Sequence, residues 1–196
     1  MDKSIQNEKL LSQIKEKDEY TKEHSDRVAE YSVLIGEKLG LSAKEVDTLR
    51  IGGLFHDIGK IGISDNILQK TSKLTDNEYS EIKTHPSIGV HILEEEPTFK
   101  EIIPIIEHHH ERFDGKGYPS GLQGEEIPYM AKIVAVADTF DAMTSNRSYR
   151  NALELNTVKQ EIKKCEGTQF DPQITEAFLD ILNNDFSKIK EIQDRY

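Results

Sequence analysis

Residues 54–60 read LFHDIGK, and this stretch decides the fold and the function that we predict for the chain. An imidazole, His56, and a carboxylate, Asp57, stand side by side at the end of an apolar run. Burying either side chain is costly unless it is paired or binds a metal. Lys60 follows Asp57 by about one turn of helix. The stretch therefore predicts a polar centre inside an apolar core.

Helix start and stop signals on both sides of this stretch predict an all-α fold. Ser42 and Glu45 have the spacing of a capping box, which opens a helix that runs to His56. Thr75 and Glu78 form a second box of this kind. No segment shows the alternating pattern of a strand.

Further signals extend the helical pattern. Thr21 is the expected N-cap of a helix that Gly40 ends, and Asp171 is the expected N-cap of another, with Pro172 in its first turn. We also predict helices from His85, before residues 108–110 and over 129–145. Residues 114–128, DGKGYPSGLQGEEIP, form a structured loop by composition. We expect a lead-in helix or linker at 1–13 and one helical domain at 14–196.

The composition excludes some kinds of partner. Asp and Glu number 36 against 25 Lys and Arg, a formal net charge of −11, which disfavours nucleic acid and anionic membranes as partners. Bound metals can still attract a small anionic substrate. The single Cys165 cannot form an internal disulfide, and there is no apolar run of membrane-spanning length or signal peptide. We expect a soluble, cytoplasmic protein.

Histidines and acidic residues near predicted helix ends form the candidate site. Each alone is more often a structural residue than a metal ligand. Taken together, five imidazoles and two carboxylates exceed the needs of one metal and suit two metals bridged by a carboxylate. The alternative is a set of separate structural residues. The candidates are His24, His56, Asp57, His85, His109, His110 and Asp138.

Five sequence motifs resemble those of the HD-GYP subfamily of HD-superfamily metal-dependent phosphohydrolases. They are DEYTKEHSDRVAEY, FHDIGKIGISDNIL, HHERFDGKGYPSGLQGEEIP, AVADTFDAMTSNRSYR and GTQFDP. The resemblance covers about residues 14–182, and residues 114–119 carry the name-giving signature.

The resemblance implies an all-α cyclic di-GMP phosphodiesterase that produces pGpG, with GMP as a further product. By the same resemblance, Asp57 bridges two divalent metals. His24, His56 and Asp138 complete one site, and His85, His109 and His110 complete the other; His91 and His108 fall outside the pattern. Fe or Mn is favoured, although Ni, Co and Zn also suit such ligands.

The expected mechanism is attack by a metal-bridging hydroxide, with Asp57 and Lys60 as catalytic residues. Lys60 is expected to contact a phosphate oxygen, and by resemblance Arg147 and Arg150 bind the substrate phosphate or guanine. Tyr20 stands where some members of the subfamily have a glutamate for a third metal. A phenol is a poor substitute ligand, so we predict two metals.

The loop at 114–128 has two interpretations. It could form a wall of the site, or dock a partner such as a diguanylate cyclase (GGDEF-type) domain; Lys116 and Tyr118 are its exposed candidates. A homodimer stays open. The alternatives for the whole chain are a phosphohydrolase of another nucleotide or a non-catalytic binding scaffold.

Overall fold

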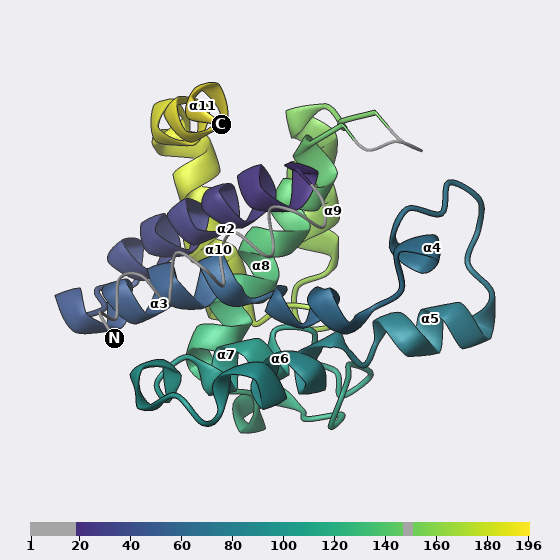
Figure 1. Cartoon of the computed structure of the whole chain (residues 1–196). Coiled ribbons are helices and arrows are strands. Elements are labelled where there is room, and N and C mark those ends of the chain that lie inside the picture. Colours follow the sequence, from purple (N-terminus) through teal and green to yellow (C-terminus); the bar gives the residue numbers. More distant parts are fainter. Residues whose placement is uncertain (1–18, 147–150) are drawn as a thin grey trace.

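The computed structural model describes residues 19–146 and 151–196, and side chains from residue 23 onward. This part of the chain contains helices and no strand, which confirms the all-α prediction (Figure 1). Short 3₁₀ turns at Ile58–Gly62, Pro97–Phe99 and Gly124–Glu126 separate some of the helices. The α-helices are α2 (Glu19–Lys38), α3 (Ala43–Phe55), α4 (Asp65–Leu68), α5 (Asp76–Ile82), α6 (His85–Leu93), α7 (Ile103–His108), α8 (Tyr129–Thr144), α9 (Leu155–Lys164), α10 (Pro172–Asn184) and α11 (Phe186–Arg195).

Three of the predicted helix caps, at Ser42, Thr75 and Asp171, are present. Ser42 accepts a hydrogen bond from the backbone of Glu45, whose carboxylate accepts one from the Ser42 backbone at 2.8 Å. Thr75 begins α5 by the same reciprocal arrangement. Asp171 caps α10, and Pro172 is its first residue. These caps satisfy backbone N–H groups that a helix start leaves unpaired.

The predicted N-cap at Thr21 is wrong, because the chain is already helical at Glu19. His24 therefore lies inside α2 rather than in its first turn. The predicted lead-in at 1–13 lies outside the described residues. The sequence did not predict α4, which is only one turn long. It also did not predict α11, a largely polar helix in which Ile189 and Ile192 are buried.

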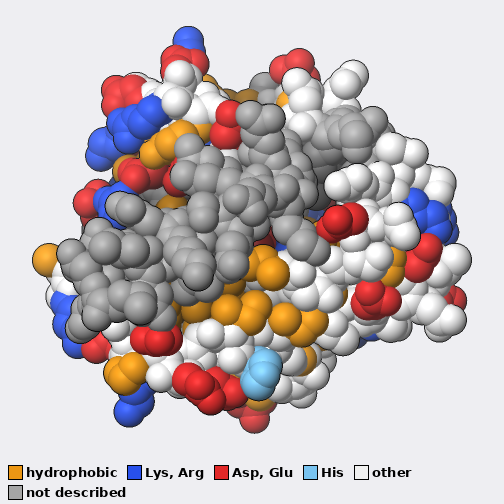
Figure 2. All heavy atoms as spheres, in the orientation of Figure 1, with side chains coloured by type: hydrophobic (Ala, Val, Ile, Leu, Met, Phe, Trp, Pro, Cys, Tyr) orange, Lys and Arg blue, Asp and Glu red, His pale blue; other side chains and the backbone are white. Residues whose placement is uncertain are grey.

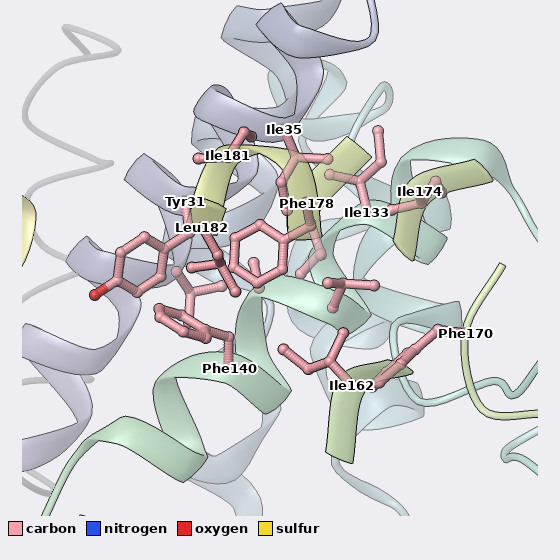
Figure 3. Close-up of a cluster of buried hydrophobic side chains, with 14 of the residues drawn as sticks. Tyr31, Ile35, Ile133, Phe140, Ile162, Phe170, Ile174, Phe178, Ile181 and Leu182 are labelled. Carbon is pink, nitrogen blue, oxygen red and sulfur yellow. The ribbon is translucent and has the colours of Figure 1, made fainter. Parts of the chain in front are cut away.

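The core consists of two groups of buried apolar side chains. The larger is built mainly by α2, α8, α9, α10 and α11, and Figure 3 shows its aromatic centre at Tyr31, Phe140 and Phe178. The smaller contains Phe55 and Ile58 with side chains from α6 and α7. His56 and Asp57 lie between Phe55 and Ile58 in the sequence, so the apolar packing of these neighbours anchors the pair.

Two glycines allow the close approaches that assemble the site. A Cβ on Gly53 would lie 2.6 Å from the Cα of Ala29, so α2 and α3 could not pack as closely with a larger residue. A Cβ on Gly59 would lie 1.8 Å from the carbonyl oxygen of His85. Glycine at 59 therefore lets the turn after Asp57 lie against the start of α6.

Helices α4 and α5 project to one side, at the right of Figure 1, and contribute no side chain to either core group.

Acidic and basic side chains are interspersed on the face of the molecule that Figure 2 shows. Across residues 19–146 and 151–196, we find no helix with the length and apolar character of a membrane span.

Candidate metal centre

The site is built where helix ends meet. His56 is the C-cap of α3, His109 is the C-cap of α7 and His85 is the first residue of α6. Asp57 follows His56 directly and is 3% exposed. Residues that are up to 53 positions apart in the sequence are thereby brought to one buried point.

Two groups of potential ligand atoms share Asp57. In each group, one ligand atom per residue lies within 4.8 Å of the others. We call the first the imidazole site, made of Asp57, His85, His109 and His110. We call the second the mixed site, made of His24, His56 and Asp57. Asp138 lies beside the mixed site, with its Oδ1 3.3 Å from His24 Nε2.

Backbone carbonyls orient three of these histidines. In each, Nδ1 lies within hydrogen-bond distance of the carbonyl oxygen three residues earlier. Because a carbonyl can only accept, Nδ1 must carry the proton and Nε2 is left to bind a metal. These carbonyls are available because they lie near helix C-termini. The pairs are His56 with Gly53 (2.7 Å), His85 with Ile82 (2.8 Å) and His109 with Ile106 (2.9 Å).

Burial keeps the histidines of the imidazole site neutral. It lowers the pKa of His110 to about 3, and lowers the pKa of His85 below its ordinary value. Burial and the neighbouring His110 hold the pKa of His109 well below its usual range. Neutral imidazole is the form that binds metals.

In the mixed site, the pKa of His24 is raised rather than lowered. Burial alone lowers the pKa of His24, but hydrogen bonds to Asp138 and Asp141 outweigh it and raise the pKa to about 9. Although burial disfavours the ionised form of Asp138, the hydrogen bond from His24 holds the pKa of Asp138 well below its usual range. Burial likewise opposes ionisation of Asp57, yet the charges of Lys60 and His56 hold the pKa of Asp57 far below its ordinary value.

The donor set fits divalent metal ions. The Nε2 of His56 and the Oδ1 of Asp57 are buried and have no hydrogen-bond partner among the described residues. Such atoms are costly inside a protein unless something binds them. The imidazole rings also lie in contact with one another. The ring centroids of His85 and His110 are 5.0 Å apart, and those of His56 and His109 are 5.2 Å apart. Imidazole and carboxylate ligands around a shared aspartate suit transition metals.

The other predicted residues fall into three groups. Lys60 reaches the centre, with its Nζ 2.5 Å from Asp57 Oδ2. Arg147 and Arg150 lie outside the described residues, as does the side chain of Tyr20. His91 is exposed and pairs with Glu94, so it lies away from the site. His108 takes part in neither ligand group.

The loop at 114–128 closes one side of the centre. Tyr118 stacks on His110 with ring centroids 4.8 Å apart, and burial raises the pKa of its phenol. Its prediction as an exposed residue is therefore wrong, whereas Lys116 is exposed. Glu111, directly after the candidate ligand His110, accepts hydrogen bonds from the backbone N–H groups of three loop residues. They are Ser120 (2.7 Å), Gly121 (3.0 Å) and Leu122 (3.1 Å).

Sequence reasoning missed Glu111, Asp141 and Arg27. All three are buried. Arg27 and Asp141 are 114 positions apart, whereas Glu111 accepts from loop residues 9 to 11 positions away. Helical spacing offered a signal for two of them. Asp141 follows Asp138 by three residues, and Arg27 follows His24 by three, so each lies on the same helix face as a predicted ligand.

Comparison with known proteins places the chain in a family. The family model described as "HD domain" matches residues 9–174. A protein of Thermotoga maritima named "Cyclic di-GMP phosphodiesterase" is 41% identical over 190 residues, covering 95% of this chain and 50% of the relative. A protein of Vibrio cholerae named "3'3'-cGAMP-specific phosphodiesterase 3" is 35% identical over 182 residues, covering 91% of this chain and 40% of the relative.

A solved structure has the same fold. It is described as an HDG"Y"P protein from Bdellovibrio bacteriovorus, with a TM-score of 0.69 at 23% identity, and the match covers 84% of this chain and 53% of that one. This chain thus spans half or less of the length of the two curated relatives.

Proposed function

The chain belongs to the HD domain family, and from this premise we propose that it hydrolyses a phosphodiester bond of cyclic di-GMP to give pGpG, with GMP as a further product. The relative from Thermotoga maritima, 41% identical to this chain, carries that activity in its name. The proposal concerns the whole protein, of which this chain supplies the candidate metal centre.

The sharing of Asp57 between two ligand groups is the observation that carries the proposal. One carboxylate with two oxygens can serve two ions, and the imidazole site and the mixed site meet at this residue. We therefore propose two divalent ions, Fe or Mn, with Asp138 completing the mixed site. The roles of the seven ligand residues are part of this proposal.

Two ions held there would supply an activated water and neutralise the charge of the phosphate. The protein's own contribution is orientation and charge. A buried hydrogen bond to the backbone carbonyl of Gly53 orients the imidazole of His56. Lys60 is the nearest described cation to the carboxylate of Asp57 that the two ligand groups share. We propose that Lys60 contacts a non-bridging phosphate oxygen and stabilises its developing charge.

The remaining roles rest on the sequence. Arg147 and Arg150 suit a phosphate or guanine through bidentate hydrogen bonds. The exposed Lys116 on the loop at 114–128 gives a diguanylate cyclase domain a point of contact. The homodimer and the cytoplasmic location stay predictions.

Two alternative functions compete with this proposal. The relative from Vibrio cholerae is named for 3'3'-cGAMP, so the base at one position of the substrate could differ. A non-catalytic scaffold would keep the fold and bind the dinucleotide without cleaving it. Both are separable by one product assay.

The test is metal quantification after anaerobic purification, followed by product analysis with cyclic di-GMP and 3'3'-cGAMP. We expect two equivalents of metal and faster release of pGpG from cyclic di-GMP. Asp57→Ala should lose both ions and at least about 10³-fold in kcat/KM, because the ions supply several kcal/mol of charge stabilisation.

The matched control is Asp47→Ala, which removes an exposed aspartate from α3 and should leave both quantities unchanged. Hydrolysis by the metal-free protein would contradict the metal-dependent mechanism. Tight binding of cyclic di-GMP without product, in protein carrying both ions, would favour the scaffold.

A further inference from the structure

His24 differs from the other oriented histidines in its backbone surroundings. His56, His85 and His109 each use a carbonyl near a helix C-terminus. His24 lies inside α2, where the carbonyls of the preceding turn are engaged by the helix itself. Its Nδ1 therefore needs an acceptor from another element.

Asp141 of α8 supplies that acceptor. Its Oδ2 lies 2.8 Å from His24 Nδ1, across 117 residues of sequence. The carboxylate is 0% exposed and is itself held by Arg27, with Nε donating to Oδ1 at 2.6 Å and Nη2 donating to Oδ2 at 3.1 Å. Such a bidentate pair fixes the plane of the carboxylate as well as its position.

The order of these residues along α2 and α8 supports a positioning role. His24 and Asp138 face the metal centre, and Arg27 and Asp141 lie one turn further along the same two helices. Ser145, the C-cap of α8, donates to Asp141 Oδ2 at 3.3 Å and accepts from Arg27 Nη2 at 3.2 Å. Arg27, Asp141 and Ser145 are thus hydrogen-bonded to one another, and Asp141 is also bonded to His24.

We propose that Asp141, held in place by Arg27, is a positioning residue that keeps Nε2 of His24 aimed at the mixed site and thereby sets the metal affinity of that site. The inference rests on the proposed two-metal function. A carboxylate that accepts from the far nitrogen of a metal-binding histidine fixes the ring and raises its basicity, and its loss costs about 10–100-fold in metal affinity.

The test is a metal titration that resolves the two equivalents. Removing Asp141 alone would take the bidentate carboxylate partner from the buried Arg27, so we use paired substitutions. Arg27→Met with Asp141→Leu removes the acceptor and the charge together. We expect one equivalent to bind about 10–100-fold more weakly and the other to be unchanged.

A second pair keeps the test informative if the first fails to fold. Arg27→Gln with Asp141→Asn retains an acceptor oxygen for His24, and we expect a smaller loss on the same equivalent. Glu37→Ala is the control, because Glu37 is an exposed residue of α2. It should leave both affinities unchanged.

The outcomes separate this inference from the proposed function. If both paired variants bind both equivalents as tightly as wild type, Asp141 has no positioning role, while the two-metal proposal stands. An equal weakening of both equivalents would also overturn the role, since it would indicate general loosening of the fold. Wild-type protein that binds no metal would remove the proposed function itself.

Discussion

His24 in the mixed site and the histidines of the imidazole site are all buried, but their pKa values shift in opposite directions. In the imidazole site, burial dominates and lowers the pKa of His85, His109 and His110. In the mixed site, carboxylates around His24 outweigh burial and raise its pKa. The difference comes from the neighbours, because His24 is as deeply buried as the others. A buried histidine without carboxylates that outweigh burial is therefore neutral and ready to bind a metal. A buried histidine whose neighbouring carboxylates raise its pKa must first lose a proton.

This contrast has a consequence for metal loading. A metal can replace the proton of an imidazolium, so binding at the mixed site releases a proton, whereas the imidazole site is already deprotonated at neutral pH. The affinity of the mixed site should fall more steeply as the pH falls from 9.

Removing one histidine from each site should produce the largest effect. His109→Ala should abolish one metal equivalent and His24→Ala the other, because each contributes to only one ligand group. Each variant should lose about 10³-fold or more in kcat, since one ion supplies several kcal/mol of stabilisation. Metal titration and steady-state kinetics measure both quantities. His91→Ala, at an exposed position, is the control. If His109→Ala lost both ions, the two sites would act as a single cooperative unit.

Removing Lys60 tests the residue that touches the carboxylate shared by the two sites. Lys60→Met should retain both metals and lower kcat/KM by about 10²-fold, the cost of one donor to a developing charge. If Lys60 only neutralised Asp57, its loss would change metal affinity and leave kcat/KM of the fully loaded enzyme unaltered. Lys100→Met removes an exposed lysine and is the matched control.

The sequence predicted features that depend on neighbouring residues. The capping boxes at Ser42 and Thr75 and the cap at Asp171 are each complete within four residues, and the structure contains all three. Helix α2 was predicted to begin at Thr21, although a polar residue with a good capping side chain can also lie inside a helix. The local signal at Thr21 did not distinguish these two cases.

The residues behind the ligands were not predictable in this way. His24 and Asp141 are 117 positions apart, and nothing in the sequence pairs them. Glu111 holds a loop through backbone N–H groups, which exist at every residue other than proline and carry no sequence signature. Predicting such partners requires the fold, because tertiary packing decides which polar groups meet.

A further predicted effect is on the stability of the metal-free protein, and it distinguishes His24 from His110 by sign. His24 has an ordinary pKa of 6.5 and a folded pKa of about 9, so the folded state binds more protons than the unfolded state between these values. Its contribution is complete below pH 6.5 and is lost as the pH rises through 9. Since one pKa unit is about 1.4 kcal/mol and the two pKa values differ by about 2.5, the loss is at most about 3.5 kcal/mol.

His110 acts in the opposite direction. Its folded pKa of about 3 lies below 6.5, so stability is lost as the pH falls from 6.5 towards 3. Urea unfolding in the presence of a chelator should therefore give a maximum near about pH 6.5. Because Asp57 and Asp138 also lose stability in acid, only the alkaline side isolates one residue. His24→Asn should remove that alkaline loss, and His91→Asn should retain it. An alkaline loss that persisted in His24→Asn would show that the charge on His24 does not stabilise the fold, and the electrostatic contrast between the two sites would fail.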